Sequence, residues 1–402
     1  MLPTTTQPPR PPHAVGVYLA VVQFFLLIGW VVYAAYLPQL AKAAGLEAKW
    51  VPWLLMADQL VFIVTDLAVG LASDRAARLL GRVGRAMVLA TLLSCAAFLL
   101  LPWVAKQGSP LALIGVTFVW AVTSAALRAP PLTLLGRYVA TPQQPLMVAL
   151  ASLGLGLAGA VAPYLALQLK GVPPAWPFLL SALCLAVVTL GMVAAERSLA
   201  RSGGAAASAA VQSGHTLPVG PAAAFLLAAA LGAAAFQWHS SVASAPLALR
   251  FAPAADLPWL LPVFWVGFNL ALWPAGLLAS RHGPWRAMAL GALLACGGNA
   301  AAAFAGALPT LLVAQAVAGV GWALLLCSAF SGALALGQGA HAGLMSGALN
   351  AVLATAALAR IAVVSQVAPS GALVVNLAWL AAAGFAACAL ISHWQARTAS
   401  PG

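Results

Sequence analysis

The sequence predicts an all-α membrane protein with twelve transmembrane helices, and its composition, hydropathy and length all support this fold class. Of the 402 residues, 63% are hydrophobic and only 6% are charged, and the mean hydropathy is +1.00. Soluble domains contain about 45–50% apolar and about 25% charged residues, so the charged side chains here are too few to cover a water-soluble surface. A membrane helix with its loop takes roughly 33 residues, which gives about twelve such units in this chain.

Twelve continuous apolar runs are the elements of this prediction. Each is long enough to cross a bilayer as a helix, whereas the strands of a membrane β-barrel would alternate apolar and polar residues. Proline and glycine inside several runs are compatible with membrane helices, because neighbouring helices can satisfy the freed backbone groups. We expect helices at 15–40, 50–72, 86–104, 110–136, 146–169, 176–195, 221–246, 257–279, 287–306, 309–334, 342–367 and 371–394.

A stretch rich in Ala, Ser and Gly divides the chain in the middle, and this composition is typical of a flexible linker. A weak internal repeat supports the division: Gly70-Leu-Ala-Ser-Asp74-Arg75 follows the second expected helix, and Gly276-Leu-Leu-Ala-Ser-Arg281 follows the eighth. Two parallel six-helix repeats around a central cavity are therefore expected. The predicted units are an N-terminal tail at 1–14, a bundle at 15–195, a linker at 196–220, a second bundle at 221–394 and a C-terminal tail at 395–402.

The distribution of basic residues predicts the orientation, because cytoplasmic loops of membrane proteins carry an excess of Lys and Arg. If the N-terminus is cytoplasmic, the inner side carries Arg10, Arg75, Arg78, Arg82, Arg85, Arg137, Arg197, Arg201, Arg281, Arg286 and Arg397. The outer side then carries Lys42, Lys49, Lys106, Lys170 and Arg250. We expect both termini in the cytoplasm and the chain in a bacterial-type inner membrane. The net charge of +12 is scattered over these loops, so we expect no nucleic-acid partner.

The segment at the end of the second expected helix resembles the signature loop of the major facilitator superfamily of transporters. The glycine allows a close approach between helices, and the aspartate can cap a helix N-terminus or pair with an arginine. In the family this loop holds the two halves together in one state and releases them in another. The resemblance assigns this latch role to Gly70, Asp74, Arg75, Arg78, Gly81 and Arg82.

A longer pattern, Asp66-x-x-x-Gly70-x-x-x-Asp74-Arg75-x5-Gly81-Arg82, resembles the glycoside–pentoside–hexuronide cation symporters, the melibiose-permease branch of the superfamily. In that branch an Asp-x-Pro in the fourth helix supplies an acid that binds sugar. Here the corresponding residues are Arg128-Ala-Pro130, so the sign of the charge is reversed. This departure argues against a neutral sugar as the substrate.

Two of the six acids lie inside an expected helix, Asp58 and Asp66 in the second one. Eight residues separate them, about 80° around a helix and about 12 Å along it, so both can face one cavity. A carboxylate in the membrane is costly unless it pairs, coordinates a cation or takes up a proton. We expect Asp66 to be the coupling acid, with Asp58 as the second candidate; a structural ion pair is the alternative.

Arg128, in the fourth expected helix, keeps its charge and therefore needs a partner. The partner is either Asp66 or Asp58, or an anionic substrate, and the two interpretations can coexist. Other polar and aromatic residues could line a substrate cavity at the membrane midplane, although each could equally serve in helix packing. The predicted substrate-binding residues are Arg128, Trp120, Gln23, Tyr33, Gln237, His239, Asn269, Trp322, Asn350 and Arg360.

We find no hydrolase, nucleotide-binding or zinc-protease motif, so we expect neither an enzyme nor an ATP-driven pump. The five cysteines lie in apolar runs without metal-ligand spacing, and we expect no metal site and no cofactor. The leading hypothesis is a monomeric secondary active transporter, surrounded by membrane lipid, that imports a small polar or anionic metabolite with protons or sodium. The alternatives are a proton-coupled exporter or antiporter, and a non-transporting sensor or assembly factor with a transporter fold.

Overall fold

A computed structural model describes residues 13–76, 83–128, 130–201, 217–338, 341–367 and 369–398. Within these ranges every regular element is a helix. The N-terminal half contains α1 (His13–Ala43), α2 (Trp50–Ala76), α3 (Val83–Lys106), α4 (Pro110–Ala125), α5 (Pro130–Tyr138), α6 (Gln144–Gln168) and α7 (Ala175–Thr189), with a further helical stretch over 192–201. Residues Thr141–Gln143 form a short 3₁₀ turn, η1, that leads into α6.

The C-terminal half repeats this pattern of long and interrupted helices. It contains α9 (Val219–Trp238), a π-helical turn η2 (His239–Ala243), α10 (Ser244–Ala248), a 3₁₀ turn η3 (Ala254–Asp256), α11 (Leu257–Leu260), α12 (Pro262–His282), α13 (Pro284–Ala303), α14 (Leu308–Leu336), α15 (Ala342–Val367), α16 (Gly371–Asn376) and α17 (Leu380–Thr398). The helix that follows α7 continues to Arg201, six residues into the stretch expected as linker.

The twelve-helix prediction is confirmed. When adjoining helical elements are taken together as one segment, eleven of the described segments are long and apolar enough to cross a membrane. The twelfth segment is α13, which packs against α14 and α17 and contains the buried polar residue Asn299. The interruptions have local causes: α5, α11 and α12 begin at or next to prolines, which suit a helix start but cannot continue the backbone hydrogen bonds of a preceding helix.

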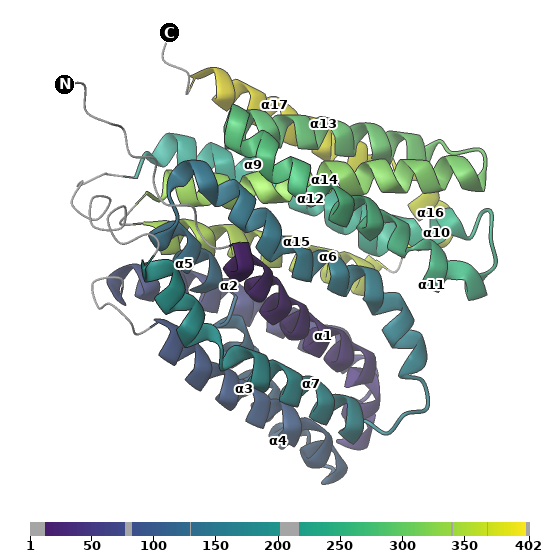
Figure 1. The fold of residues 1–402 in the computed structure, drawn as a ribbon. Coiled ribbons are helices and arrows are strands. Elements are labelled where there is room, and N and C mark those ends of the chain that lie inside the picture. Colours follow the sequence, from purple (N-terminus) through teal and green to yellow (C-terminus); the bar gives the residue numbers. More distant parts are fainter. Residues whose placement is uncertain are drawn as a thin grey trace.

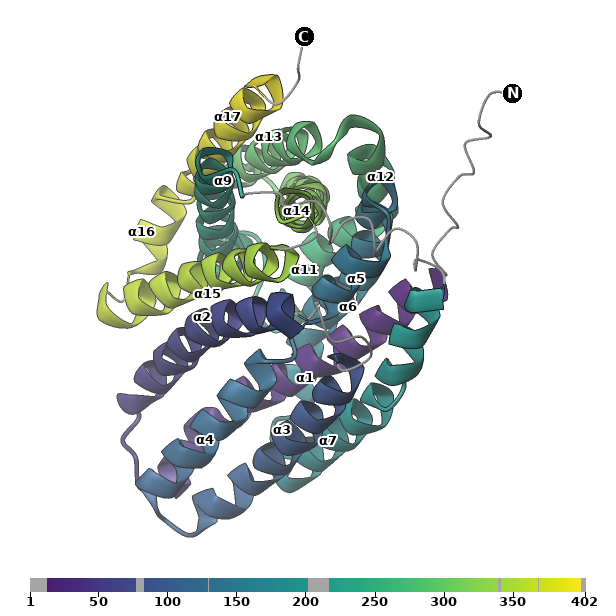
Figure 2. The same ribbon diagram turned by 90° about the vertical axis from the view of Figure 1, so that its left-hand side faces the viewer.

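The helices form two bundles that lie side by side (Figures 1 and 2). Helices α1 to α7 make one bundle and α9 to α17 the other, with α14 near the centre of the second bundle in Figure 2. The bundles meet along two helix pairs, α2 with α15 and α6 with α12. Helix α1 begins and α17 ends at the same end of the molecule (Figure 1).

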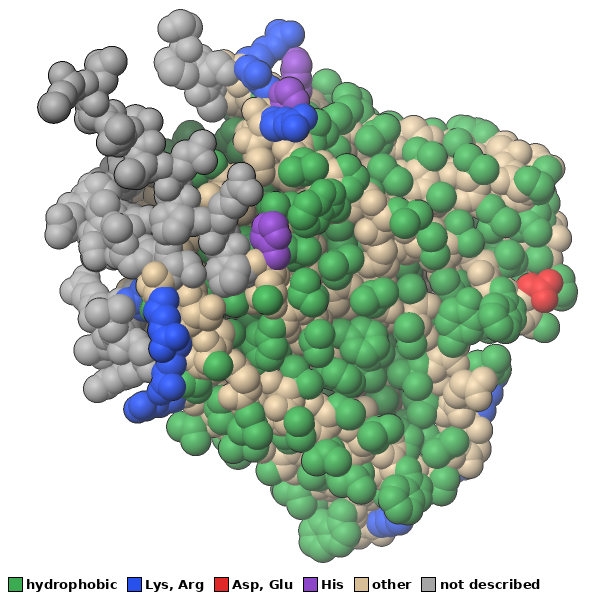
Figure 3. All heavy atoms as spheres, in the orientation of Figure 1, with side chains coloured by type: hydrophobic (Ala, Val, Ile, Leu, Met, Phe, Trp, Pro, Cys, Tyr) green, Lys and Arg blue, Asp and Glu red, His purple; other side chains and the backbone are tan. Residues whose placement is uncertain are grey.

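The outer surface is predominantly apolar, as a lipid-facing surface must be. In Figure 3, hydrophobic side chains cover most of the visible face, and the described charged side chains lie near its edges. Leu89, Leu270 and Leu390 are among the most exposed side chains. In water such exposure would favour aggregation, whereas in a bilayer the same surface is solvated by acyl chains.

Small residues allow α2 and α15 to approach closely across the boundary between the halves. A Cβ atom added at Gly70 would meet the backbone carbonyl of Gly343 and would lie 3.3 Å from Cα of Gly347. Substitution of any side chain at Gly70 therefore requires the two helices to separate. This contact fixes α2 against the first turns of α15 and places the α2 acids at the boundary between the halves.

Candidate functional site

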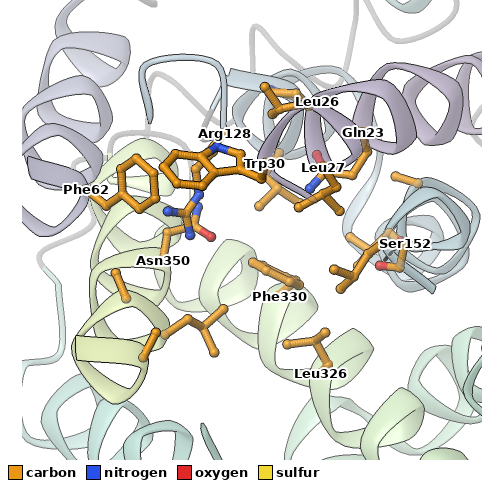
Figure 4. Close-up of a pocket in the computed structure, with 18 of the residues that line it drawn as sticks. Gln23, Leu26, Leu27, Trp30, Phe62, Arg128, Ser152, Leu326, Phe330 and Asn350 are labelled. Atoms are coloured by element: carbon orange, nitrogen blue, oxygen red, sulfur yellow. Dashed lines mark hydrogen bonds between the residues drawn. The ribbon is translucent and has the colours of Figure 1, made fainter. Parts of the chain in front are cut away.

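A cavity of about 320 Å³ lies between the two halves. Its walls come from α1, α2, α6 and the α4–α5 break of the N-terminal half, and from α9, α14 and α15 of the C-terminal half. Six lining residues carry an amide, hydroxyl or guanidinium group: Gln23, Gln59, Arg128, Ser152, Gln237 and Asn350. In Figure 4, Arg128 and Asn350 lie on one side of the cavity, and Gln23 and Ser152 lie on the other.

Arg128 reaches the cavity because the fourth transmembrane segment is broken beside it. Helix α4 ends at Ala125, and the backbone N–H of Arg128 donates to the Ala125 carbonyl at 3.0 Å. Helix α5 begins at Pro130, and neither Pro130 nor Pro131 has an N–H to continue the hydrogen bonds of α4. The break leaves Arg128 and Pro131 on the cavity wall.

The guanidinium of Arg128 lies between the cavity and two side chains of α2. Its Nη1 is 3.4 Å from Oδ2 of Asp66, and its carbon is 4.8 Å from the centre of the Phe62 ring. The Asp66 side chain is fully buried, whereas 22% of the Arg128 side chain is exposed. The acid therefore lies behind the cation, and the cation is the partner that faces the cavity.

The pairing with Arg128 leaves the Asp66 carboxylate without a hydrogen bond in the described part of the chain. Neither carboxylate oxygen of Asp66 has a hydrogen-bond partner in the described part of the chain. A separation of 3.4 Å exceeds the roughly 2.7–2.9 Å of a charge-assisted hydrogen bond. Because a guanidinium has five N–H donors, the single contact with Asp66 does not engage all of them.

Asp58, the other acid of α2, lies in a different environment. The Tyr33 hydroxyl donates to its Oδ2 at 2.9 Å, and both side chains are buried. The rings of Tyr33 and Trp120 are 4.4 Å apart at their centres, within an aromatic cluster that also includes Trp30. Asp58, Tyr33 and Trp120 are thus held in packing contacts and do not line the cavity.

Of the ten predicted substrate-binding residues, the structure brings Gln23, Arg128, Gln237 and Asn350 together around the cavity. The other six lie outside its wall. Trp322 is buried with its ring stacked on Phe236, their centres 4.3 Å apart. Arg360 lies on α15 about 15 Å along the helix axis from Asn350.

The remaining polar candidates of the C-terminal half have partners inside their own bundle. His239 Nε2 lies 2.8 Å from Oε1 of Gln315, whose Nε2 donates to the Ser244 hydroxyl at 3.3 Å. That hydroxyl donates to the His239 carbonyl at 2.9 Å, which closes a ring of hydrogen bonds around the π-helical turn η2. Asn269 Nδ2 donates to the Trp265 carbonyl at 2.8 Å.

Sequence reasoning missed several residues of the cavity wall, among them Trp30, Gln59, Phe62, Ser152 and Phe330. The residues of α2 could have been found. Gln59 and Phe62 precede Asp66 by seven and four positions, so all three lie on one face of a helix.

The predicted latch residue Asp74 makes a contact between the halves. Its Oδ1 accepts from the backbone N–H of Gly343 at 2.7 Å, and its Oδ2 accepts from the N–H of Leu344 at 2.8 Å. The carboxylate thus caps the N-terminus of α15, where unpaired N–H groups favour a negative charge. Arg75 is exposed. Arg78, Gly81 and Arg82 lie outside the described residues.

Comparison with known proteins gives the family. The sequence pattern of the Major Facilitator Superfamily matches residues 19–361, which is most of the chain. The chain belongs to the Major Facilitator Superfamily. It is therefore a secondary transporter rather than an enzyme, as the sequence predicted. No curated protein sequence matches it.

Solved structures of other transporters share the fold at low sequence identity. The human organic anion transporter MFSD10 (TETRAN) is 14% identical with a TM-score of 0.68, over 96% of this chain and 99% of that one. A bacterial homologue of the iron transporter ferroportin, in an outward-facing state, is 14% identical with a TM-score of 0.75, over 95% and 99%. The E. coli fucose:proton symporter FucP, in an outward conformation, is 15% identical with a TM-score of 0.63, over 94% and 98%.

Proposed function

We propose that this Major Facilitator Superfamily member is a symporter that carries a small organic anion together with a proton. One observation carries the proposal: Arg128 faces the central cavity, while Asp66, its counter-charge, lies fully buried behind it. Among the described residues that line the cavity, Arg128 is the only charged one. A fixed cation in a cavity with low-dielectric walls attracts anions and repels amines.

Binding of the anion provides the link to a proton. When a substrate carboxylate pairs with Arg128, the charge of Asp66 is no longer balanced, and a buried carboxylate without a cation is costly. Protonation of Asp66 restores the original net charge, so substrate and proton enter together. The two other acids of α2, Asp58 and Asp74, each lie about 12 Å along the helix from Asp66 and have partners of their own.

A proton suits this site better than sodium, because the guanidinium beside Asp66 repels a metal cation. Two of the structural neighbours have activities of the proposed kinds: MFSD10 is described as an organic anion transporter and FucP as a fucose:proton symporter. At 14–15% identity these likenesses establish the fold alone, so the support for the proposal comes from Arg128 and Asp66. The resemblance of α2 to the melibiose-permease branch receives no support from these neighbours, and the proposal does not depend on it.

Three variants test whether Arg128 binds the substrate directly. Arg128→Lys and Arg128→Ala should both lose uptake of organic anions into proteoliposomes, while transport of neutral analogues is less affected, because an ammonium cannot replace a bidentate guanidinium. If Arg128 is only the structural partner of Asp66, Arg128→Ala should impair all substrates alike. In that case the double variant with Asp66→Asn should recover part of the lost activity, and the proposal would be wrong.

The proposed orientation places the Asp74 contact on the cytoplasmic side, with both termini there. Single cysteines in place of Arg201 and Lys170, both exposed, should react with a membrane-impermeant reagent from opposite sides of the membrane. The parent protein, with its five native cysteines, is the control for background labelling. Labelling of both positions from one side would contradict the topology.

A further inference from the structure

Gln23, on α1, is a polar side chain of the cavity wall whose hydrogen-bonding groups are unused. The residue is half-buried, and its amide makes no hydrogen bond with any residue that the structure describes. The protein does not cover this amide completely, and in Figure 4 it lies at the cavity on the side opposite to Arg128. A primary amide has two N–H donors and a carbonyl acceptor, so Gln23 offers a ligand both kinds of hydrogen bond.

Other polar groups of the wall are less available to a ligand. The Ser152 hydroxyl already donates to the Val148 carbonyl at 2.8 Å. Oε1 of Gln237 accepts from the Ser241 hydroxyl at 3.4 Å, and Nδ2 of Asn350 is fully covered by the surrounding protein. These groups are engaged or enclosed, which distinguishes them from the Gln23 amide.

A second amide without a hydrogen bond in the described part of the chain belongs to Gln59. It lies on α2, three residues before Phe62, whose ring contacts the Arg128 guanidinium. Gln59 therefore belongs to the side of the cavity that holds the cation, whereas Gln23 lies across from it (Figure 4). An anion that binds to Arg128 and extends across the cavity brings its far end to Gln23.

The charges of the wall restrict the group that can meet Gln23. Among the described lining residues there is no acid, so an ammonium group would lack a counter-charge and would be repelled by Arg128. A second carboxylate would lack a cation of its own in a desolvated site. A methyl group would leave the Gln23 amide desolvated without a partner. A hydroxyl group is neutral, and it can donate to the amide oxygen or accept from the amide nitrogen.

We propose that the transported anion is a hydroxylated monocarboxylate: Arg128 binds its carboxylate, and the Gln23 amide binds a hydroxyl group at its far end. This inference rests on the anion transport proposed above and adds the substrate class and the residue that selects it. Apolar side chains of the wall, such as Leu27, Leu155 and Phe330, pack against the carbon chain between the two ends. A few polar groups in an otherwise apolar pocket fix the orientation and the specificity of a ligand in this way.

The test compares pairs of monoanions that differ by one hydroxyl group. The probes are butanoate and 4-hydroxybutanoate, hexanoate and 6-hydroxyhexanoate, and benzoate and 4-hydroxybenzoate, because three lengths sample the span of the cavity. Binding to the purified full-length protein is measured by equilibrium binding and by thermal shift, since a ligand of the folded state raises its apparent stability. In at least one pair, we expect the hydroxylated acid to bind about tenfold more tightly, because a site that hydrogen-bonds a hydroxyl rejects the analogue that lacks it.

Variants assign this preference to Gln23. Gln23→Leu keeps a side chain of similar size but removes the amide, so the hydroxylated acid should bind about tenfold more weakly while the unsubstituted acid binds as before. A merely structural role of Gln23 would instead weaken both acids alike. Gln39→Leu, the same substitution at an exposed position of α1, is the matched control and should keep the preference. Gln59→Leu should also keep it, because that amide lies on the Arg128 side of the cavity.

Four outcomes would overturn the inference. If no hydroxylated acid binds more tightly than its partner, the substrate class is wrong. If the preference survives in Gln23→Leu, or disappears in Gln59→Leu, the assignment to Gln23 is wrong. If none of the six monoanions binds the parent protein, the inference fails as well. The function proposed above fails separately, when Arg128→Ala retains the full uptake of organic anions in proteoliposomes.

Discussion

The two halves share a helical plan, but two of their buried titratable groups, His239 and Asp66, lie in different surroundings. In the C-terminal half, His239, Gln315 and Ser244 close a ring of hydrogen bonds within one bundle. In the N-terminal half, both oxygens of Asp66 lack a hydrogen bond among the described residues, and its ion pair with Arg128 is long. A satisfied network stabilises one packing, whereas an unsatisfied charged pair can exchange its partner for a ligand. This difference is the reason that we propose ion coupling at Asp66 and not at His239.

Removal of the acid in the N-terminal half should have the largest effect on transport. Asp66→Asn keeps the shape of the side chain but cannot titrate, so accumulation of substrate against a gradient should be lost while exchange across the membrane continues. The measurement compares proton-driven uptake with counterflow in proteoliposomes. If the Asn variant still concentrates substrate, another residue couples transport to protons. The difference between the halves then does not concern coupling.

The contact that joins the halves should have the next largest effect. Asp74→Asn removes the charge that caps α15 and leaves one acceptor oxygen for the two N–H groups of Gly343 and Leu344. Loss of a hydrogen bond to a charged group, about 1.5–3 kcal/mol, should shift the equilibrium between the open and closed forms about ten- to a hundredfold. Distances between spin labels on the two halves report this shift. A large loss of affinity with unchanged distances would instead place Asp74 in substrate binding.

The second acid of α2 sharpens the comparison within the N-terminal half. In Asp58→Asn, the amide oxygen can still accept from the Tyr33 hydroxyl, so coupling should persist and uptake should fall by no more than a fewfold. Its matched partner is Asp66→Asn, eight residues along the same helix. Failure of accumulation in Asp58→Asn together with normal accumulation in Asp66→Asn would exchange the roles of the two acids.

The smallest effect on coupling is expected in the C-terminal half. Because His239 is buried and bonded to Gln315, the variant His239→Gln should leave the pH dependence of uptake unchanged, although the loss of packing should lower the melting temperature. The measurement is uptake as a function of external pH, with Asp66→Asn as the positive control. A profile that becomes flat in His239→Gln would make this histidine the coupling group and remove the contrast between the halves.

The sequence by itself determined the membrane class, the twelve spans and the family. Each of these depends on quantities that a sequence states directly, such as the length of an apolar run near 20 residues and the spacing within the Gly70–Arg75 motif. It also identified Arg128 and the two acids of α2 as exceptional, because charges inside apolar runs are costly wherever they lie.

Only the tertiary structure decided which of the remaining side chains meet in the cavity. In a soluble protein, an apolar stripe shows which face of a helix is buried. A membrane helix is apolar both on the side that faces lipid and on the side that packs against other helices, so its hydropathy does not predict which face points inward. Thus Gln59 and Ser152 line the cavity although the sequence prediction did not include them. Tyr33 and Trp120, which it did include, pack inside the N-terminal half. The neighbours of each helix fix its rotation, and the rotation of α15 places Asn350 on the cavity wall.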